Sequence, residues 1–87
     1  MPNEIVERVY LGSVATAMDK KVMQGMGITH ILTVAGNLRV YHPDDFTYCH
    51  LMVWDRPDQD ITTHFDTAFD FINKAMSDGG KLLVHCV

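Results

Sequence analysis

The stretch from Gly79 to Val87, which reads GGKLLVHCV, constrains the fold of this chain more than any other. Its paired glycines are typical of the end of a helix. The apolar run from Leu82 to Val84 is of the kind that forms a fully buried parallel strand. That strand would carry His85 and Cys86 to its C-terminal end. Because ligands bind beyond the carboxyl ends of strands in open α/β sheets, we expect a site at Cys86.

The chemistry open to Cys86 depends on the element that comes after this strand. A helix N-terminus there would bind anions through unpaired backbone N–H groups and the helix dipole. The same environment favours the thiolate form of a cysteine, which is a nucleophile. Buried cysteines are also common as small, inert hydrophobic residues. From Cys86 alone, both a functional thiol and a packed thiol remain open.

The composition limits the classes of protein to which the chain can belong. With 87 residues, 47% of them hydrophobic, it is one small domain or part of one. A net charge of −4, with only seven Lys and Arg residues, argues against nucleic-acid and acidic-membrane partners. Two cysteines make no disulfide framework, no signal-peptide pattern is present, and no apolar run is long enough to span a bilayer. We therefore expect a cytosolic or nuclear protein.

The first third of the chain is predicted to contain two strand-like pieces and a broken helix. The strand-like pieces lie at 5–6 and 9–11. The helical pattern runs over 13–26 in two short pieces, with Asp19 as the N-cap of the second piece. Gly27 is a suitable residue to end that helix.

Two strands are predicted in the middle of the chain. The β-rich run 28–34 is bounded by glycines and is predicted as a central strand. Residues 35–45 follow as a loop rich in turn-forming residues. The run 46–53 alternates along its length and is predicted as a third strand with both faces largely covered.

The clearest helix follows a polar loop at 54–60. Its apolar residues fall on one predicted helical face: Ile61, Phe65, Ala68, Phe69, Ile72 and Met76. The glycines at 79–80 would end this helix and lead into the last strand. A strand, a helix and a strand in series predict a right-handed crossover and a parallel pair. The fold class is therefore α/β, with a central, mostly parallel sheet flanked by helices.

Asp55 is the candidate acid for a nucleophilic Cys86. A thiolate that attacks a phosphate ester needs an acid to protonate the leaving oxygen. If the strand 46–53 runs parallel to the last strand, Asp55 and Cys86 lie at the same edge of the sheet. A solvated loop carboxylate is the competing interpretation. Arg39 and Arg56 are loop cations that could contact an anionic substrate or only solvate the surface.

A metal site is not predicted. The pairs Cys49-His50 and His85-Cys86 resemble ligand pairs, but adjacent strand residues point to opposite faces of a sheet. Neither pair could therefore hold one ion. The other histidines show no paired spacing.

Taken together, the residues resemble the dual-specificity protein phosphatases, compact relatives of the protein tyrosine phosphatases. The resemblance covers the chain from about Asn3 to Val87 and rests on a series of blocks in register: YLGS at 10–13, GITHILTV at 27–34, FTY at 46–48, VWD at 53–55, FI at 71–72 and LVHC at 83–86. It implies a phosphotyrosine-phosphatase-like α/β fold. It also implies that residues 1–87 are the N-terminal portion of one catalytic domain, without its phosphate-binding loop and C-terminal helices.

The resemblance also implies roles for three residues. Cys86 matches the nucleophile that forms a phosphocysteine intermediate, and His85 matches the histidine that orders the loop around the thiolate. Asp55 matches the general acid, with Asp58 and Asp60 as alternatives if the loop register differs. The implied activity is hydrolysis of phosphotyrosine and phosphoserine or phosphothreonine. We expect a monomer that uses no cofactor or metal and acts on a phosphoprotein, a protein kinase among the candidates.

Two other functions stay open. One is a non-catalytic relative that binds phosphoproteins or acts as a scaffold, although such a module needs neither Cys86 nor Asp55. The other is a different α/β thiol enzyme, such as a sulfurtransferase. Residues 1–87 alone are expected to be inactive, because they lack the N–H donors and the guanidinium that hold a phosphate. They are also expected to be poorly folded, because strands 28–34 and 82–86 would have a bare face. Cys49 is expected to be packed in the core, with a disulfide to Cys86 as the alternative.

Overall fold

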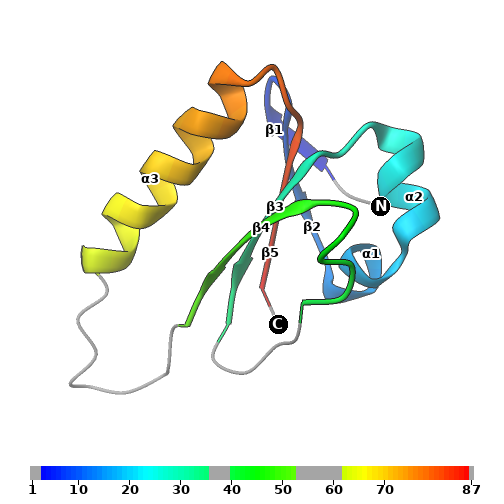
Figure 1. The fold of residues 1–87 in the computed structure, drawn as a ribbon, viewed down its shortest axis with the longest axis horizontal. Helices are drawn as coiled ribbons and strands as arrows, with labels where there is room; N and C mark the ends of the chain where they lie inside the picture. Colours follow the sequence, from blue (N-terminus) through cyan, green and yellow to red (C-terminus); the bar gives the residue numbers. More distant parts are fainter. Residues whose placement is uncertain (1–2, 36–39, 53–61, 87) are drawn as a thin grey trace.

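The computed structural model describes residues 3–35, 40–52 and 62–86, and within them the chain forms one mixed sheet with helices on both faces (Figure 1). The strands are β1 (Asn3–Val6), β2 (Val9–Gly12), β3 (His30–Val34), β4 (Thr47–Leu51) and β5 (Leu82–Cys86). The helices are α1 (Val14–Met18), α2 (Lys20–Met26) and α3 (Thr62–Ser77). The strand order is β1-β2-β5-β3-β4, and only β1 is antiparallel to its neighbour. The predicted α/β class is confirmed.

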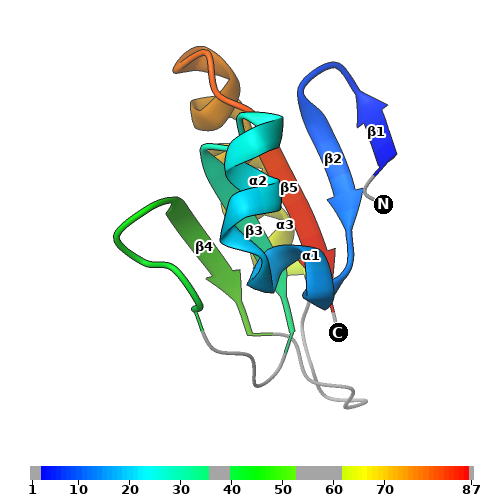
Figure 2. The same cartoon turned by 90° about the vertical axis from the view of Figure 1, so that its right-hand side faces the viewer.

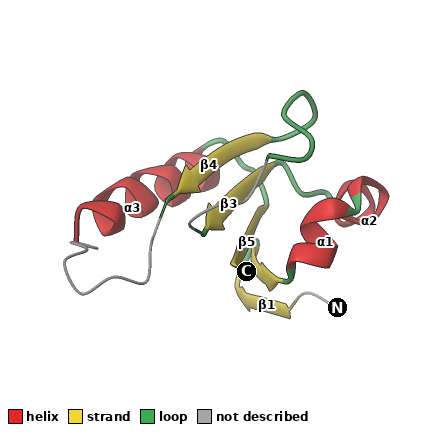
Figure 3. Cartoon of the chain, turned by 90° about the horizontal axis from the view of Figure 1, so that it is seen from below, coloured by secondary structure: helices red, strands yellow, loops and turns green. Residues whose placement is uncertain are grey.

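The sheet lies between two helical layers, with α1 and α2 on one face and α3 on the other (Figures 1 and 3). The face under α1 and α2 is built by a buried cluster comprising Ala17, Met23, Ile28, Ile31, Phe46 and Leu83. The face under α3 is built by a second buried cluster comprising Val9, Leu32, Leu51 and Leu82. Ile31 and Leu83 are buried on one face, and Leu32 and Leu82 on the other. The expectation that β3 and β5 have a bare face is therefore wrong for these parts of both strands.

Both pieces of the broken helix at the N-terminal side have N-caps, of which the cap at Asp19 was predicted. The Ser13 hydroxyl accepts from the backbone N–H of Thr16 at the start of α1, and Asp19 accepts from the N–H of Val22 at the start of α2. Gly27 ends α2 in the left-handed conformation, with φ +80°. Local side-chain chemistry therefore sets the bounds of both short helices.

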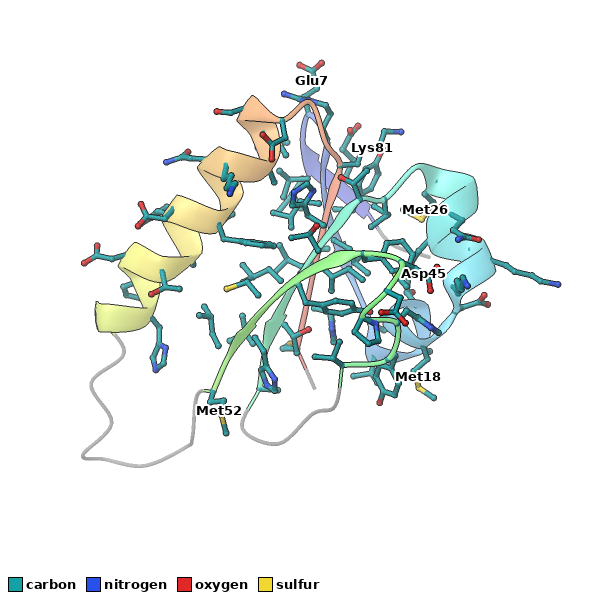
Figure 4. All side chains as sticks on the ribbon, in the orientation of Figure 1. Glu7, Met18, Met26, Asp45, Met52 and Lys81 are labelled. Atoms are coloured by element: carbon teal, nitrogen blue, oxygen red, sulfur yellow. The ribbon has the colours of Figure 1, made fainter. Side chains whose placement is uncertain are left out.

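Two basic side chains tie the helix ends to the sheet. Arg8 lies in the β1–β2 turn with φ +68°. Its guanidinium donates to the carbonyl oxygen of Met76 in the last turn of α3 (3.4 Å) and to that of Gly80 just beyond the helix (3.3 Å). Lys81 donates from Nζ to the carbonyl oxygen of Met26 at 2.9 Å, and both residues are labelled in Figure 4. Cations are favoured at these positions because the last carbonyls of a helix are unpaired and carry partial negative charge.

The sheet order corrects one prediction about the last crossover. β4, α3 and β5 follow one another in the chain, and both strands run in the same direction, as expected. They do not pair, because β3 lies between them and pairs with both (Figure 2). β5 therefore enters the sheet between β2 and β3, which places its end at the centre of the carboxyl edge.

The buried face of α3 also differs from the predicted one. Phe65 and Phe69 are 53% and 62% exposed, whereas Phe71, which lay outside the predicted stripe, packs against the sheet. The residues of α3 that pack on the second cluster are Ala68, Phe71, Ile72 and Met76. The predicted apolar stripe of α3 is wider than the part of the helix that contacts the sheet. The helix lies over β3 and β4, and described residues leave Phe65 and Phe69 on its flank uncovered.

β4 is the edge strand on this side and is shorter than expected. It covers Thr47–Leu51 rather than 46–53, and its first residue is exposed while its last is buried. The expectation that both of its faces are largely covered is therefore only partly correct.

None of the helices in the described ranges is long and apolar enough to cross a membrane.

Candidate active site

The parallel strands β2, β5, β3 and β4 all end at one edge of the sheet, which we call the carboxyl edge (Figure 2). Cys86 ends β5 and pairs in register with Val34, and Val34 pairs with Leu51 on its other side. Cys86 and the end of β4 therefore lie at the same level, with β3 between them. This is the location at which sheets of this class bind ligands.

Cys86 is exposed at this edge and is a free cysteine. Alternation along β5 places it on the same face as Leu82 and Val84, which belong to the layer under α3. The buried β5 run ahead of it holds the backbone in place, while Cys86 itself is exposed. The predicted delivery of a thiol by a buried strand is thus present in the structure.

His85 points to the opposite face and is only 2% exposed. Its Nε2 atom lies 2.7 Å from the hydroxyl oxygen of Thr33 on β3. Its Nδ1 atom is buried and forms no hydrogen bond within the described part of the chain. Buried polar atoms are nearly always paired, so Nδ1 marks a point where the site needs a partner.

Burial lowers the pKa of His85 below its usual value, because the charged imidazolium is poorly solvated in the core. The backbone of Cys86 opposes this shift, and the charge of nearby His50 adds to it. His85 is therefore neutral at physiological pH and acts here as a hydrogen-bonding group rather than as a cation.

A row of residues crosses the sheet just below the carboxyl edge. Gly12, His85, Thr33 and His50 are neighbours in the strand register and therefore share a face. His50 Nε2–H donates to the carbonyl oxygen of Ala35 at 3.1 Å, and the Ala35 N–H donates to the Leu51 carbonyl oxygen at 3.1 Å. These two bonds hold the ends of β3 and β4 together beside the site.

The sequence did not indicate Thr33 as a site residue, and it indicated His50 only as half of the rejected Cys49-His50 ligand pair. The one local signal is a polar residue at position 33 in an apolar strand. Their relation to His85 depends on the strand register, which a single sequence does not reveal.

Cys49 lies in the core, as expected. It packs against the cluster under α3, and burial raises the pKa of its thiol. It pairs with Leu32 on β3, whereas Cys86 lies beyond β3 on β5. Residues two strands apart are separated by about 9.5 Å, and a disulfide needs Cα atoms within about 7 Å. A Cys49–Cys86 disulfide therefore does not fit this fold.

The remaining predicted site residues lie outside the described residues. These are Asp55, Asp58, Asp60, Arg39 and Arg56. The sheet brings their flanking strands to the carboxyl edge, since β3 and β4 both end there. In the described ranges, no three His, Cys, Asp or Glu side chains are grouped so as to hold a metal ion.

A comparison with known families decides the classification. Residues 9–87 match the sequence model of the family described as "Dual specificity phosphatase, catalytic domain". The chain belongs to this family. The match includes β2 and runs through β5, so the four parallel strands and the His85-Cys86 pair lie within it.

Two similar proteins of Arabidopsis thaliana carry the same family name. Dual specificity protein phosphatase 1 is 48% identical over 86 residues, which are 99% of this chain and 43% of that protein. Dual specificity protein phosphatase 1B is 44% identical over 84 residues, which are 97% of this chain and 50% of that protein. The chain thus spans about half the length of the curated relatives it matches.

A solved structure agrees with this dual specificity phosphatase fold. The human tyrosine phosphatase-like serine/threonine/tyrosine-interacting protein superposes with a TM-score of 0.88 at 32% sequence identity. The superposition covers 98% of this chain and 61% of that one.

Proposed function

We propose that this chain is the N-terminal part of a protein phosphatase domain that hydrolyses phosphotyrosine and phosphoserine or phosphothreonine through Cys86. The observation that carries the proposal is the position of Cys86. This exposed residue ends a buried central strand at the carboxyl edge of the sheet. Membership of the dual specificity phosphatase family supports it.

The first step is attack of the Cys86 thiolate on phosphorus. A sulfur–phosphorus bond forms, and the phosphorus–oxygen bond to the substrate side chain breaks. The leaving oxygen takes a proton from Asp55, which acts as general acid. Asp55 is four residues beyond Leu51 in the sequence, and Leu51 lies level with Cys86 across β3, so a short connection suffices to reach the thiol.

The second step releases the enzyme. The Asp55 carboxylate takes a proton from water as the water attacks the phosphocysteine. Inorganic phosphate leaves, and the Cys86 thiolate is restored. Covalent catalysis of this kind divides one slow displacement into two faster ones.

Binding of the phosphate dianion needs groups beyond those described. Several converging N–H donors and a bidentate guanidinium are the usual means of holding a phosphoryl group. The lengths of the relatives support the view that a further part of the protein supplies them. Residues 1–87 would then form the sheet and deliver the nucleophile.

The test is hydrolysis of an aryl phosphate by the full-length protein and two serine variants. Cys86→Ser should abolish turnover, because an alcohol is a poor nucleophile at neutral pH, while binding of a phosphate analogue survives. Cys49→Ser is the matched control and should keep most of the activity. Turnover by Cys86→Ser at a rate close to wild type would contradict the proposal.

A non-catalytic phosphoprotein-binding role is the second candidate. The name of the similar human structure supports this second candidate, because it contains the words "phosphatase-like" and "interacting protein". In that case the wild-type protein would bind a phosphopeptide without hydrolysing it. Measured turnover by the wild-type protein that is lost in Cys86→Ser would rule this candidate out.

A further inference from the structure

The ends of β3 and β4 are joined by a side chain as well as by the backbone of the sheet. His50 on β4 donates from Nε2 to the carbonyl oxygen of Ala35, the residue after β3, at 3.1 Å. This bond is partly buried, and Ala35 is only 5% exposed. A hydrogen bond shielded from water is costly to lose, because the groups left behind are unpaired. His50 has no part in the two chemical steps of hydrolysis, so those steps do not explain the contact.

The partner atom decides which ring nitrogen of His50 carries a hydrogen. A carbonyl oxygen only accepts hydrogen bonds, so Nε2 must be the donor. The neutral ring and the charged ring can both carry a hydrogen on Nε2. The contact is therefore compatible with either charge state of His50.

This contact lies just before the segment that contains the proposed acid. The Ala35 N–H donates to the Leu51 carbonyl oxygen at 3.1 Å, so Ala35 is bonded to the end of β4 through both its N–H and its carbonyl group. Leu51 is 7% exposed, whereas Met52, which is labelled in Figure 4, is 52% exposed. Leu51 is thus the last buried residue described before the segment 53–61.

The end of β4 depends on this contact more than the end of an inner strand would. β4 is the edge strand, and β3 is its one neighbour in the sheet that the described residues form. An edge strand lacks backbone hydrogen bonds on its outer side. Asp55 follows Leu51 by four residues. With so few residues in between, a displacement of Leu51 would also displace Asp55.

We propose that His50 is a positioning residue of the phosphatase site, which fixes the end of β4 and so the place of the general acid Asp55. This inference rests on the proposed function. It assigns no contact between His50 and substrate. The effect of His50 passes through Ala35 and Leu51 to the segment that contains the acid.

Loss of the contact should affect protonation of the leaving oxygen more than attack by the nucleophile. A good leaving group, as in para-nitrophenyl phosphate, departs with little help from an acid, whereas the poorer one of phenyl phosphate depends on it. A misplaced acid should therefore slow phenyl phosphate hydrolysis more. A general loss of packing would slow both substrates alike.

The experiment compares His50→Gln with His50→Asn in the full-length protein. The amide nitrogen of glutamine can take the place of Nε2, whereas the asparagine side chain is shorter by one carbon and does not reach the Ala35 carbonyl oxygen. Thr47→Val, at the exposed start of β4, is the matched control. We would measure kcat/KM, which reports the first chemical step, for both substrates. Each His50 variant is also made together with Asp55→Asn, and melting temperatures show whether each protein is folded.

His50→Gln and Thr47→Val should keep kcat/KM close to wild type for both substrates. His50→Asn should lower kcat/KM for phenyl phosphate by roughly 10–100-fold, since a misplacement of about 1 Å can cost about 10²-fold. Its effect on para-nitrophenyl phosphate should be much smaller. In the presence of Asp55→Asn the same substitution should change kcat/KM little, because two residues that act through one group are not additive.

Two kinetic results would overturn the inference: a folded His50→Asn that slows both substrates equally, or an effect of His50→Asn that is undiminished by Asp55→Asn. Nitrogen-15 NMR of labelled histidine in the wild-type protein tests the contact even if His50→Asn fails to fold, because a bare Nε2 on His50 would also overturn it. An inactive wild-type protein with the hydrogen on Nε2 of His50 would instead count against the proposed function, so the two failures are distinguishable.

Discussion

The junction between α3 and β5 leaves no room for a side chain at Gly80. A Cβ at this position would meet Thr29 Oγ1 and lie 2.8 Å from His30 Nδ1. The Thr29 hydroxyl is itself fixed, because it accepts from the Lys81 N–H at 3.0 Å and bonds His30 Nδ1 at 2.7 Å. Neither neighbour can move without losing a hydrogen bond.

Gly80→Ala should therefore lower the free energy of unfolding by about 1–3 kcal/mol, as overpacking usually does. Gly25→Ala is the control, since a Cβ there meets nothing within 4 Å on the exposed side of α2. It should raise stability by about 0.5–1 kcal/mol, because alanine favours helix. Urea unfolding of the full-length protein measures both values. Equal effects of the two substitutions would show that the junction is not tightly packed.

Burial of His85 should make stability depend on pH. Its pKa is lower in the folded state than the unfolded value of about 6.5, so the unfolded chain binds more protons as the pH falls. Its contribution is therefore full above that pH and is lost below it, with a slope of at most about 1.4 kcal/mol per pH unit. Unfolding between pH 7.5 and 5 should show a steeper loss in wild type than in His85→Gln. Parallel curves would mean that His85 does not titrate differently on folding.

At the scale of elements, the sequence predicted what depends on neighbouring residues. The Asp19 cap and the stop at Gly27 lie within the segment they bound, so the second short helix could be placed from the sequence. The buried face of α3 and the insertion of β3 between β4 and β5 depend on distant contacts. The same is true of the Thr33–His85 bond, which only the register creates.

Asp55 lies in the sequence just after β4, outside the described residues. Asp55→Asn in the full-length protein should lower kcat by about 10²–10⁴-fold, the usual effect of losing a positioned acid. The loss should be larger for poor leaving groups, which depend most on protonation. Hydrolysis rates for a series of aryl phosphates measure it. A larger effect of Asp58→Asn or Asp60→Asn would assign the acid role to that carboxylate instead.

At the scale of the whole molecule, apolar side chains remain exposed on several elements. They include Val6 and Leu11 of the β1–β2 hairpin and Phe65 and Phe69 of α3. Uncovered apolar surface of this kind favours association or packing against further chain. The sequence predicted uncovered apolar surface on β5, but Leu82 and Leu83 are covered there. The uncovered apolar surface lies instead on the hairpin and on α3.

Residues 1–87 expressed alone should consequently be inactive and prone to aggregate. The N–H donors and the guanidinium that would hold a phosphate are not among the described residues, and the exposed apolar side chains would lack cover. Size-exclusion chromatography, thermal melting and an aryl phosphate assay test this. A monomer that melts cooperatively would contradict the folding part, and hydrolysis by that monomer would contradict both parts.

The central claim is that Cys86 is the nucleophile of a phosphatase. The most direct measurement is to mix the full-length Asp55→Asn variant with excess aryl phosphate, quench within milliseconds and locate the added phosphate by peptide mass spectrometry. We predict a phosphate on the Cys86 sulfur, absent from Cys86→Ser and from unmixed protein. Turnover with phosphate attached to another residue, or with no covalent intermediate under conditions that trap one, would contradict it.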